Sequence, residues 1–140
     1  MKKKIAIVGF GTAGQRFFAY LKKKNKPVFL SGDLNVAHQP IDLKNPKSNY
    51  NKTSGYTQDE IDGMTNFINS GFTDTFRHLY PEKIKYSWWS YRFNSRAKNI
   101  GWRIDYFIIS EEFMKYIENV LIYDKLMGSD HCPLLCIVKF

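Results

Sequence analysis

Residues 32–38, GDLNVAH, come one residue after a short apolar run at residues 28–30 that we expect to form a strand. Asp33 and Asn35 are two positions apart, and in an extended chain such residues lie on the same face. Both side chains can therefore address one phosphate group. The alternative is an Asx-turn, in which the two side chains serve only the backbone.

The same change from apolar strand to polar turn recurs twice. Residues 99–106, NIGWRIDY, place Asp105 inside an apolar run, where an unpaired carboxylate would be costly to bury. Residues 128–133, GSDHCP, supply His131. We expect Asp105 to pair with His131, which would fix the tautomer of the imidazole and raise its basicity. A purely structural ion pair is the alternative.

Together the three stretches supply three carboxylates, one carboxamide and one histidine that are candidates for chemistry. Such a set suits a divalent metal ion and an activated water beside a phosphodiester. Asp130 directly precedes His131 and should point the other way. Its hard oxygens suit Mg²⁺, which keeps several waters and needs only one or two protein carboxylates. One carboxylate alone is not a complete metal site.

The composition is that of a folded domain with a polyanionic partner. The chain has 140 residues, of which 44% are hydrophobic, and its net charge is +8. A positive balance favours nucleic acid, although lysine runs are often only solvated faces. No apolar run approaches the ~20 residues that cross a bilayer, so we expect no membrane partner. Gln15 and Arg16 interrupt the N-terminal apolar stretch, and we expect no signal peptide.

The two cysteines predict packing thiols. If Cys132 and Cys136 share one strand, their Cα atoms are ~13 Å apart, which is too far for a disulfide. This usage favours a reduced, intracellular protein, and the spacing of Cys and His does not favour zinc.

Hydrophobic patterning predicts an irregular alternation of strands and helices. A capping box at Thr57–Glu60 should open a helix that ends before Gly71, and the polar residues 34–56 should form a long loop. Strands are expected at residues 5–8, 28–30, 86–90, 104–109, 120–123 and 134–140, with further helices at 16–24 and 111–116. Without repeats or linkers, the chain reads as one α/β or α+β layered domain, residues 1–140.

The three stretches, with residues 41–47 (IDLKNPK), 76–81 (FRHLYP) and 86–99, resemble the exonuclease III / abasic-site (AP) endonuclease family of DNA repair. The resemblance covers residues 16–140 and the C-terminal half of that family. It implies a partial two-sheet β-sandwich flanked by helices. The family's N-terminal half, with its metal-binding Glu, its Asn and its active-site Tyr, has no match here, and we therefore expect weakened metal binding and impaired turnover.

The resemblance also implies an activity. A family member is a Mg²⁺-dependent hydrolase, with Mn²⁺ as the alternative metal, that cuts double-stranded DNA beside an abasic site in base excision repair. Such an enzyme is intracellular, in the cytoplasm if bacterial and in the nucleus if eukaryotic. By the same resemblance, Asp33 positions or deprotonates the attacking water and Asn35 helps to hold the phosphate. His131 contacts the scissile phosphate, Asp105 orients it, and Asp130 lies near the metal.

The resemblance assigns substrate contacts as well. Trp88, Trp102 and Ile104 match apolar walls around a flipped-out abasic sugar, which a small aromatic slot can select. The alternative is ordinary core packing, which we accept for Trp89. Side chains that could contact backbone phosphates, or lie solvated at the surface, are Asn49, Asn51, Lys52, Arg92, Arg96 and Lys98.

The N-terminus predicts something different. Gly9, Gly11 and Gly14 fit a G-x-G-x-x-G dinucleotide fingerprint between a strand and a helix. No further Rossmann strands follow, so we interpret residues 1–15 as a foreign Rossmann-like strand and glycine turn. The nuclease hypothesis thus stands beside a non-catalytic DNA-binding remnant and a less favoured dinucleotide binder. Self-association through exposed sheet edges is also expected.

Overall fold

The computed structural model describes residues 6–8 and 27–139. The strands are β1 (Ala6–Val8), β2 (Val28–Asp33), β3 (Phe72–Asp74), β4 (Asp105–Ser110), β5 (Ile117–Ile122) and β6 (Leu134–Val138). The α-helices are α2 (Pro46–Asn49), α3 (Gln58–Asn69) and α4 (Thr75–Leu79), and the 3₁₀ turns are η1 (Pro40–Asp42), η2 (Arg92–Asn94) and η3 (Glu111–Tyr116). The predicted glycine turn and the helix at 16–24, including Gly9, Gly11 and Gly14, lie outside the described residues.

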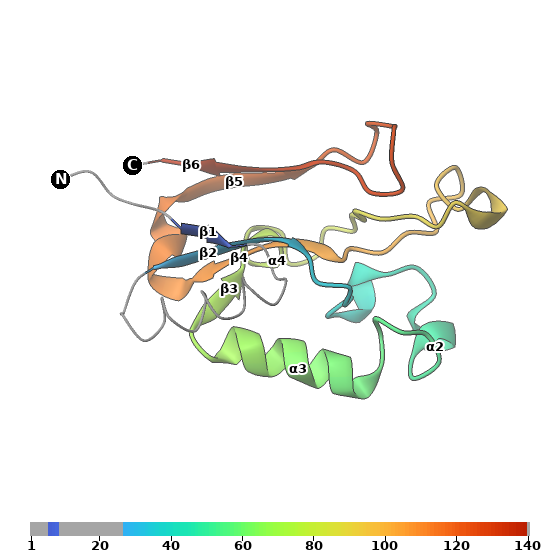
Figure 1. The fold of residues 1–140 in the computed structure, drawn as a ribbon, viewed down its shortest axis with the longest axis horizontal. Coiled ribbons are helices and arrows are strands. Elements are labelled where there is room, and N and C mark those ends of the chain that lie inside the picture. The colour runs from blue at the N-terminus through green and yellow to red at the C-terminus, as the bar shows by residue number, and fades with distance from the viewer. Residues whose placement is uncertain (1–5, 9–26, 140) are drawn as a thin grey trace.

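The described elements form three layers (Figure 1). A four-stranded sheet of order β1-β2-β4-β3 lies in the middle, with β1 parallel to β2 and the other pairs antiparallel. The antiparallel pair β5-β6 covers one face of that sheet, and α3 covers the other. This arrangement confirms the predicted layered α/β class with two sheets.

The two central strands are apolar on both faces because both faces are covered. Phe29 and Ile109 point toward β5-β6 and belong to the larger core cluster. Leu30 and Ile108, the next residues in register, point toward α3 and pack with Met64. Two-sided burial explains why β2 and β4 show apolar runs instead of a polar alternation.

Helix α3 forms where the capping box predicted it. The Glu60 carboxylate accepts a hydrogen bond from the Thr57 backbone N–H at 2.9 Å, and the Thr57 hydroxyl accepts one from the Glu60 N–H. Gly71 follows the helix with a left-handed φ of +99°, which glycine adopts readily. No helix in the described ranges 6–8 and 27–139 is long and apolar enough to span a membrane.

The predicted strand at residues 86–90 is wrong. Trp88 makes only isolated bridges, to Trp102 on one side and to His131 on the other. Its partners lie on two separate segments, so no continuous ladder of hydrogen bonds forms. Residues 86–90 instead link those two segments. The long loop at 34–56 is also more ordered than predicted, because it contains η1 and α2.

Both cysteine thiols are free. Cys132 is buried just before β6, and Cys136 is half-buried within that strand. Burial raises the pKa of each thiol to about 11, which keeps both protonated and unreactive at neutral pH.

Candidate active site

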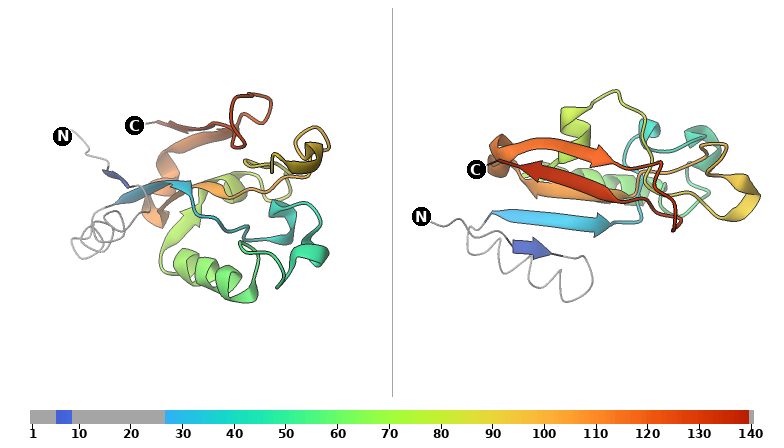
Figure 2. Two further views of the ribbon diagram at one scale, coloured as in Figure 1. Left: turned by 45° about the vertical axis from the view of Figure 1, so that its right-hand side comes forward. Right: turned by 90° about the horizontal axis from the view of Figure 1, so that it is seen from above.

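The candidate site lies at the end of the middle sheet where the central strand β2 ends and its neighbour β4 begins. Asp33, the last residue of β2, is the register partner of Asp105, the first residue of β4. The antiparallel pairing therefore brings the two carboxylates to the same end of the sheet. The loops at residues 34–56, 90–99 and 123–131 gather at this end of the molecule (Figure 2).

His131 and Asp105 form the pair that the sequence predicts. Nδ1 of His131 lies 2.8 Å from Oδ2 of Asp105, and both side chains are partly buried. With Nδ1 engaged by a carboxylate, Nε2 is the ring nitrogen that remains for a substrate. The backbone bridge between Trp88 and His131 fixes the segment that carries the imidazole.

The Asp33 side chain forms the Asx-turn with the Asn35 backbone. The Asn35 backbone N–H donates to Oδ1 of Asp33 at 2.8 Å, and Asn35 has a left-handed φ of 54°. The argument from an extended chain is therefore wrong, because β2 ends at Asp33. Asn tolerates left-handed backbone, and Asn35 lines the cavity described below.

The surroundings of Asp33 raise the pKa of its carboxyl group. Partial burial is the largest cause that raises the pKa of the Asp33 carboxyl, and the nearby charges of Asp105 and Asp130 raise it further. The hydrogen bond from Asn35 and the proximity of His131 oppose this effect without cancelling it. Asp33 is therefore a better proton acceptor than an ordinary aspartate.

Asp130 is half-buried, and hydrogen bonds from two neighbouring side chains hold its carboxylate. Its Oδ2 accepts a hydrogen bond from Nε1 of Trp88 at 3.0 Å, and its Oδ1 accepts one from the Ser129 hydroxyl at 3.2 Å. The Trp88 bond is the main reason why the pKa of Asp130 lies below its usual value. Within residues 6–8 and 27–139, no group of three or more His, Cys, Asp or Glu side chains is arranged to hold a metal ion. Asp130 can thus supply at most one ligand of an incomplete site.

A cavity of about 330 Å³ opens beside this end of the sheet. Trp88, Trp102 and Ile104 form apolar walls, while Asn35, Asn49 and His131 supply polar groups. The sequence had selected all six residues. Lining residues that it missed are Thr53, Ser54, Gly55, Ser90, Ser95 and Ile100. Small polar residues of this kind are common on surfaces, so only the three-dimensional arrangement identifies them.

Asn51 does not line the cavity. Its side-chain oxygen accepts a hydrogen bond from the backbone N–H of Gln58 at 2.7 Å, at the start of α3. This contact caps the helix, a common use of Asn, and the substrate contact of Asn51 stays a prediction. Asn49 lines the cavity, and its amide nitrogen also donates to the Asn45 carbonyl at 2.9 Å.

The three tryptophans have different surroundings. Trp102 lines the cavity and also belongs to a small core cluster with Leu43 and Tyr56, so both interpretations apply to it. Trp88 is half-buried and lines the cavity. Trp89 is a buried core residue whose Nε1 donates to the Asn99 side chain at 3.2 Å.

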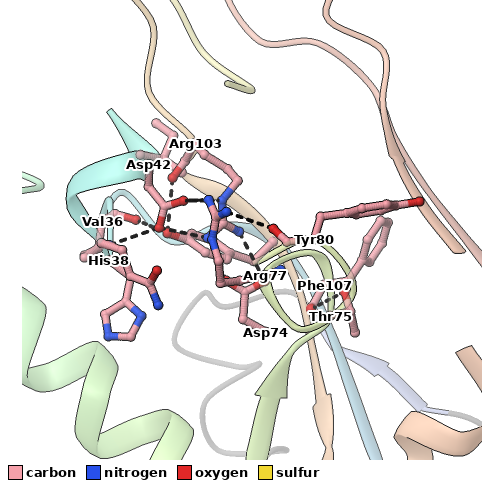
Figure 3. A network of polar contacts seen from close by, with 12 residues as sticks. Val36, His38, Asp42, Asp74, Thr75, Arg77, Tyr80, Arg103 and Phe107 are labelled. Carbon is pink, nitrogen blue, oxygen red and sulfur yellow. Dashed lines mark hydrogen bonds and ion pairs between the residues drawn. The ribbon is translucent and has the colours of Figure 1, made fainter. Parts of the chain in front are cut away.

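A buried ionic network supports the cavity wall, and the sequence did not predict it (Figure 3). Arg103 lies between the two wall residues Trp102 and Ile104, with its guanidinium against Asp42 and Asp74. Arg77 forms a further ion pair with Asp42. The backbone N–H of Arg103 also donates to the Asp42 carbonyl at 2.6 Å, so the wall is fixed at main-chain and side-chain level.

The network is electrically balanced. Burial alone would raise the pKa of Asp42, but the guanidinium groups of Arg103 and Arg77 outweigh it and hold that pKa below its usual value. Burial disfavours the charged form of Arg103, and the carboxylates of Asp74 and Asp42 reverse this, so its pKa lies above normal. Asp42 and Arg103 are therefore both charged and paired.

Comparison with known proteins places this site in a family context. Residues 10–131 match the Endonuclease/Exonuclease/phosphatase family. The exodeoxyribonuclease of Bacillus subtilis (strain 168) is 54% identical over 117 residues, which are 83% of this chain and 46% of that protein. The DNA repair nuclease APEX1 of Danio rerio is 50% identical over 121 residues, 84% of this chain and 39% of that protein. The chain thus spans less than half the length of these two relatives.

Solved structures agree on the fold. The AP endonuclease LMAP from Leishmania major superposes with a TM-score of 0.77 at 35% identity, covering 81% of this chain and 35% of that chain. An AP endonuclease from Archaeoglobus fulgidus gives 0.77 at 25% identity, covering 90% and 52%. A 3′ phosphatase from Neisseria bound to a product DNA hairpin gives 0.82 at 23% identity, covering 91% and 51%, a likeness of fold alone.

Proposed function

The chain belongs to the Endonuclease/Exonuclease/phosphatase family, and from this premise we propose that it acts in DNA repair as a phosphodiester hydrolase at abasic sites of double-stranded DNA. The observation that carries the proposal is the pair of His131 and Asp105 beside Asp33, at the mouth of a cavity with apolar walls. Such an enzyme works inside the cell, in the cytoplasm of a bacterium or the nucleus of a eukaryote.

The proposed chemistry uses the protonation state of each group. Asp33, whose pKa is raised by burial, accepts a proton from the attacking water. Asp105 keeps Nδ1 of His131 engaged, so that Nε2 can donate a hydrogen bond to a phosphate oxygen. The water oxygen then bonds to phosphorus as the P–O bond to the leaving sugar oxygen breaks. The amide of Asn35 holds a phosphate oxygen from the side of the cavity.

The proposed substrate follows from the lining of the cavity. The deoxyribose of an abasic site has lost its base and presents a small apolar face, which suits a slot walled by Trp88, Trp102 and Ile104. The cavity of about 330 Å³ is lined by neither lysine nor carboxylate, so it favours a neutral group over a charged one. The net charge of +8 supports binding to the backbone of the duplex.

We propose Mg²⁺, with Mn²⁺ as a substitute, as the metal of the reaction, where it would neutralise charge on the phosphate. Asp130 is the candidate ligand among the described residues. Because these residues do not complete a metal site, further ligands must come from outside them and we assign no catalytic step to the ion. The same observation favours a second candidate function, a non-catalytic module that binds DNA.

The test is incision of a short duplex that contains one tetrahydrofuran abasic analogue, with Mg²⁺ or with EDTA, while binding is measured in parallel. We expect Mg²⁺-dependent incision that is lost in Asp33→Asn and His131→Ala. The matched controls Asp59→Asn and His78→Ala, on exposed residues that do not line the cavity, should keep it. Binding without incision would instead support the non-catalytic module. Absence of both would overturn the two candidate functions together.

A further inference from the structure

Arg96 makes an unusual set of contacts for a residue that sequence analysis treats as a candidate phosphate ligand. Its Nη1 donates to the Ser129 carbonyl at 2.6 Å, and its Nη2 donates to the carbonyls of Asp124 and Leu126 at 3.1 and 2.5 Å. The guanidinium also lies over the Trp89 ring, 4.6 Å from its centroid. These contacts commit the guanidinium to the protein backbone.

The loop that Arg96 contacts has few other anchors. It connects β5 to the segment with Asp130 and His131, and the side chains of residues 125–129 are all exposed. Leu126 and Met127 are 53% and 76% exposed, so apolar burial does not hold the loop in place. Apart from Arg96, its ties include a turn hydrogen bond between Leu126 and Tyr123 and an ion pair of Asp124.

The far end of the same segment is held by residues 86–89. The Trp89 N–H donates to the Asp130 carbonyl at 2.9 Å, and the Cys132 N–H donates to the Ser87 carbonyl at 2.8 Å. Arg96 contacts Trp89 as well as the loop. Arg96 therefore contacts both segments that flank Asp130 and His131, namely the loop and the residues around Trp89.

We propose that Arg96 is a positioning residue, which holds the loop at residues 124–129 so that His131 stays paired with Asp105 at the cavity. A guanidinium suits this task because its donors radiate in one plane and can reach several carbonyls while the plane stacks on an aromatic ring. A lysine carries the same charge but cannot reproduce the fork or the stacking. Only the relevance of this positioning to DNA rests on the proposed function.

The proposal and the phosphate-contact interpretation predict different behaviour of two variants. If Arg96 serves a phosphate, Arg96→Lys keeps the charge and stays close to wild type, whereas Arg96→Ala does not. If Arg96 holds the loop, Arg96→Lys fails in the same way as Arg96→Ala. Lys98→Ala removes a neighbouring exposed charge and serves as the matched control.

The first measurement is amide hydrogen exchange of the whole chain. The amides of Trp89 and Cys132 report the docking of the segment that carries His131, and those of α3 report global stability. We expect exchange at the two reporter amides to accelerate by about tenfold or more in both Arg96 variants, with α3 unchanged, because local opening is independent of global unfolding. Unchanged reporters would overturn the proposal, and so would equal acceleration at α3, which indicates a general structural role.

The second measurement is the salt dependence of affinity for the abasic duplex. The positioning role predicts the same slope of log K against log salt in wild type and both Arg96 variants, and a phosphate contact predicts a slope lower by about 1 in Arg96→Ala alone. The latter result would overturn the proposal. If wild type binds no DNA, the proposed function fails, while hydrogen exchange still decides the role of Arg96.

Discussion

Arg103 donates two hydrogen bonds to the carboxylate of Asp42, from Nε to Oδ1 at 2.8 Å and from Nη2 to Oδ2 at 2.9 Å, although 61 positions separate the two residues. The pair joins η1 to the segment before β4 that carries Trp102 and Ile104, and a second carboxylate, Asp74, binds the same guanidinium. The apolar cavity wall of Trp102 and Ile104 is therefore held in place by a buried ion pair.

Breaking this pair should strongly destabilise the protein. Asp42→Asn leaves Arg103 buried with half of its counter-charge, and loss of one partner in a buried pair costs about 3–5 kcal/mol. Urea unfolding of Asp42→Asn should show this loss, and Asp62→Asn, an exposed carboxylate on α3, should stay within about 0.5 kcal/mol of wild type. A loss below about 1 kcal/mol would mean that the network relaxes around the change.

Acid should remove the same stabilisation. The pKa of Asp42 is lower in the folded protein than its ordinary value of 3.8, because the arginines outweigh burial. Its contribution to the free energy of unfolding is therefore complete above that value and is lost as the pH falls through the folded-state pKa. Between pH 6 and pH 2, the free energy of unfolding should fall more steeply with pH in wild type than in Asp42→Asn. Parallel curves of this free energy against pH would contradict the assignment.

Gly55 should tolerate no side chain. Its φ is +93°, and an added Cβ would lie 2.8 Å from the carbonyl oxygen of Asn35 at the mouth of the cavity. Gly55→Ala should therefore destabilise the fold by more than about 1 kcal/mol. Gly63→Ala is the matched control, because Gly63 lies inside α3 with free space around it and alanine should add about 0.5–1 kcal/mol of stability there. Thermal unfolding of both variants checks the two opposite signs.

Local sequence was sufficient where neighbouring residues determine the structure. The capping box of Thr57 and Glu60 contains both partners within four residues, and α3 begins where it predicts. The apolar runs of β2 and β4 likewise indicate buried strands, and the Asp105–His131 pair follows from the cost of burying a lone carboxylate.

Local sequence patterns did not predict contacts between residues that are distant in sequence. Residues 86–90 look like a strand, but the partners of Trp88 lie on two segments that the sequence does not connect. Arg103 sits in an apolar stretch with no local sign that Asp42 and Asp74 will meet it there. Asn35 depends on a left-handed turn that begins only because β2 ends at Asp33.

The outer face of β6 should promote self-association. Leu135 and Ile137 are 42% and 37% exposed, side by side on one face of a strand in a two-stranded sheet. Exposed apolar strands favour pairing with another copy. Light scattering should show a mass that rises with concentration and a smaller rise in the double variant Leu135→Lys/Ile137→Lys. The same two charges added on α3, as Asn66→Lys/Asn69→Lys, should change nothing, and a constant monomer mass in wild type would refute the expectation.

Asp33 should carry a measurable trade-off between stability and chemistry. Burial raises its folded-state pKa above 3.8, with the charges of Asp105 and Asp130 acting in the same direction. For a carboxyl group with a raised pKa, ionisation disfavours the folded state, so its contribution becomes destabilising as the pH rises past the unfolded-state value. Asp33→Asn should therefore unfold at a higher urea concentration than wild type near pH 7, and this difference should vanish below about pH 3.

A ¹³C titration of the carboxyl groups tests the cause directly. Asp33 should titrate above 3.8 in wild type, and Asp130→Asn should lower this pKa by removing a like charge while leaving it raised, because burial is the larger cause. Asp62→Asn, which changes a charge on α3, should leave the Asp33 titration in place. A pKa of 3.8 or less for Asp33 would mean that the hydrogen bond from Asn35 outweighs burial. The carboxylate would then be held as a turn-forming acceptor and would be a poor base for water.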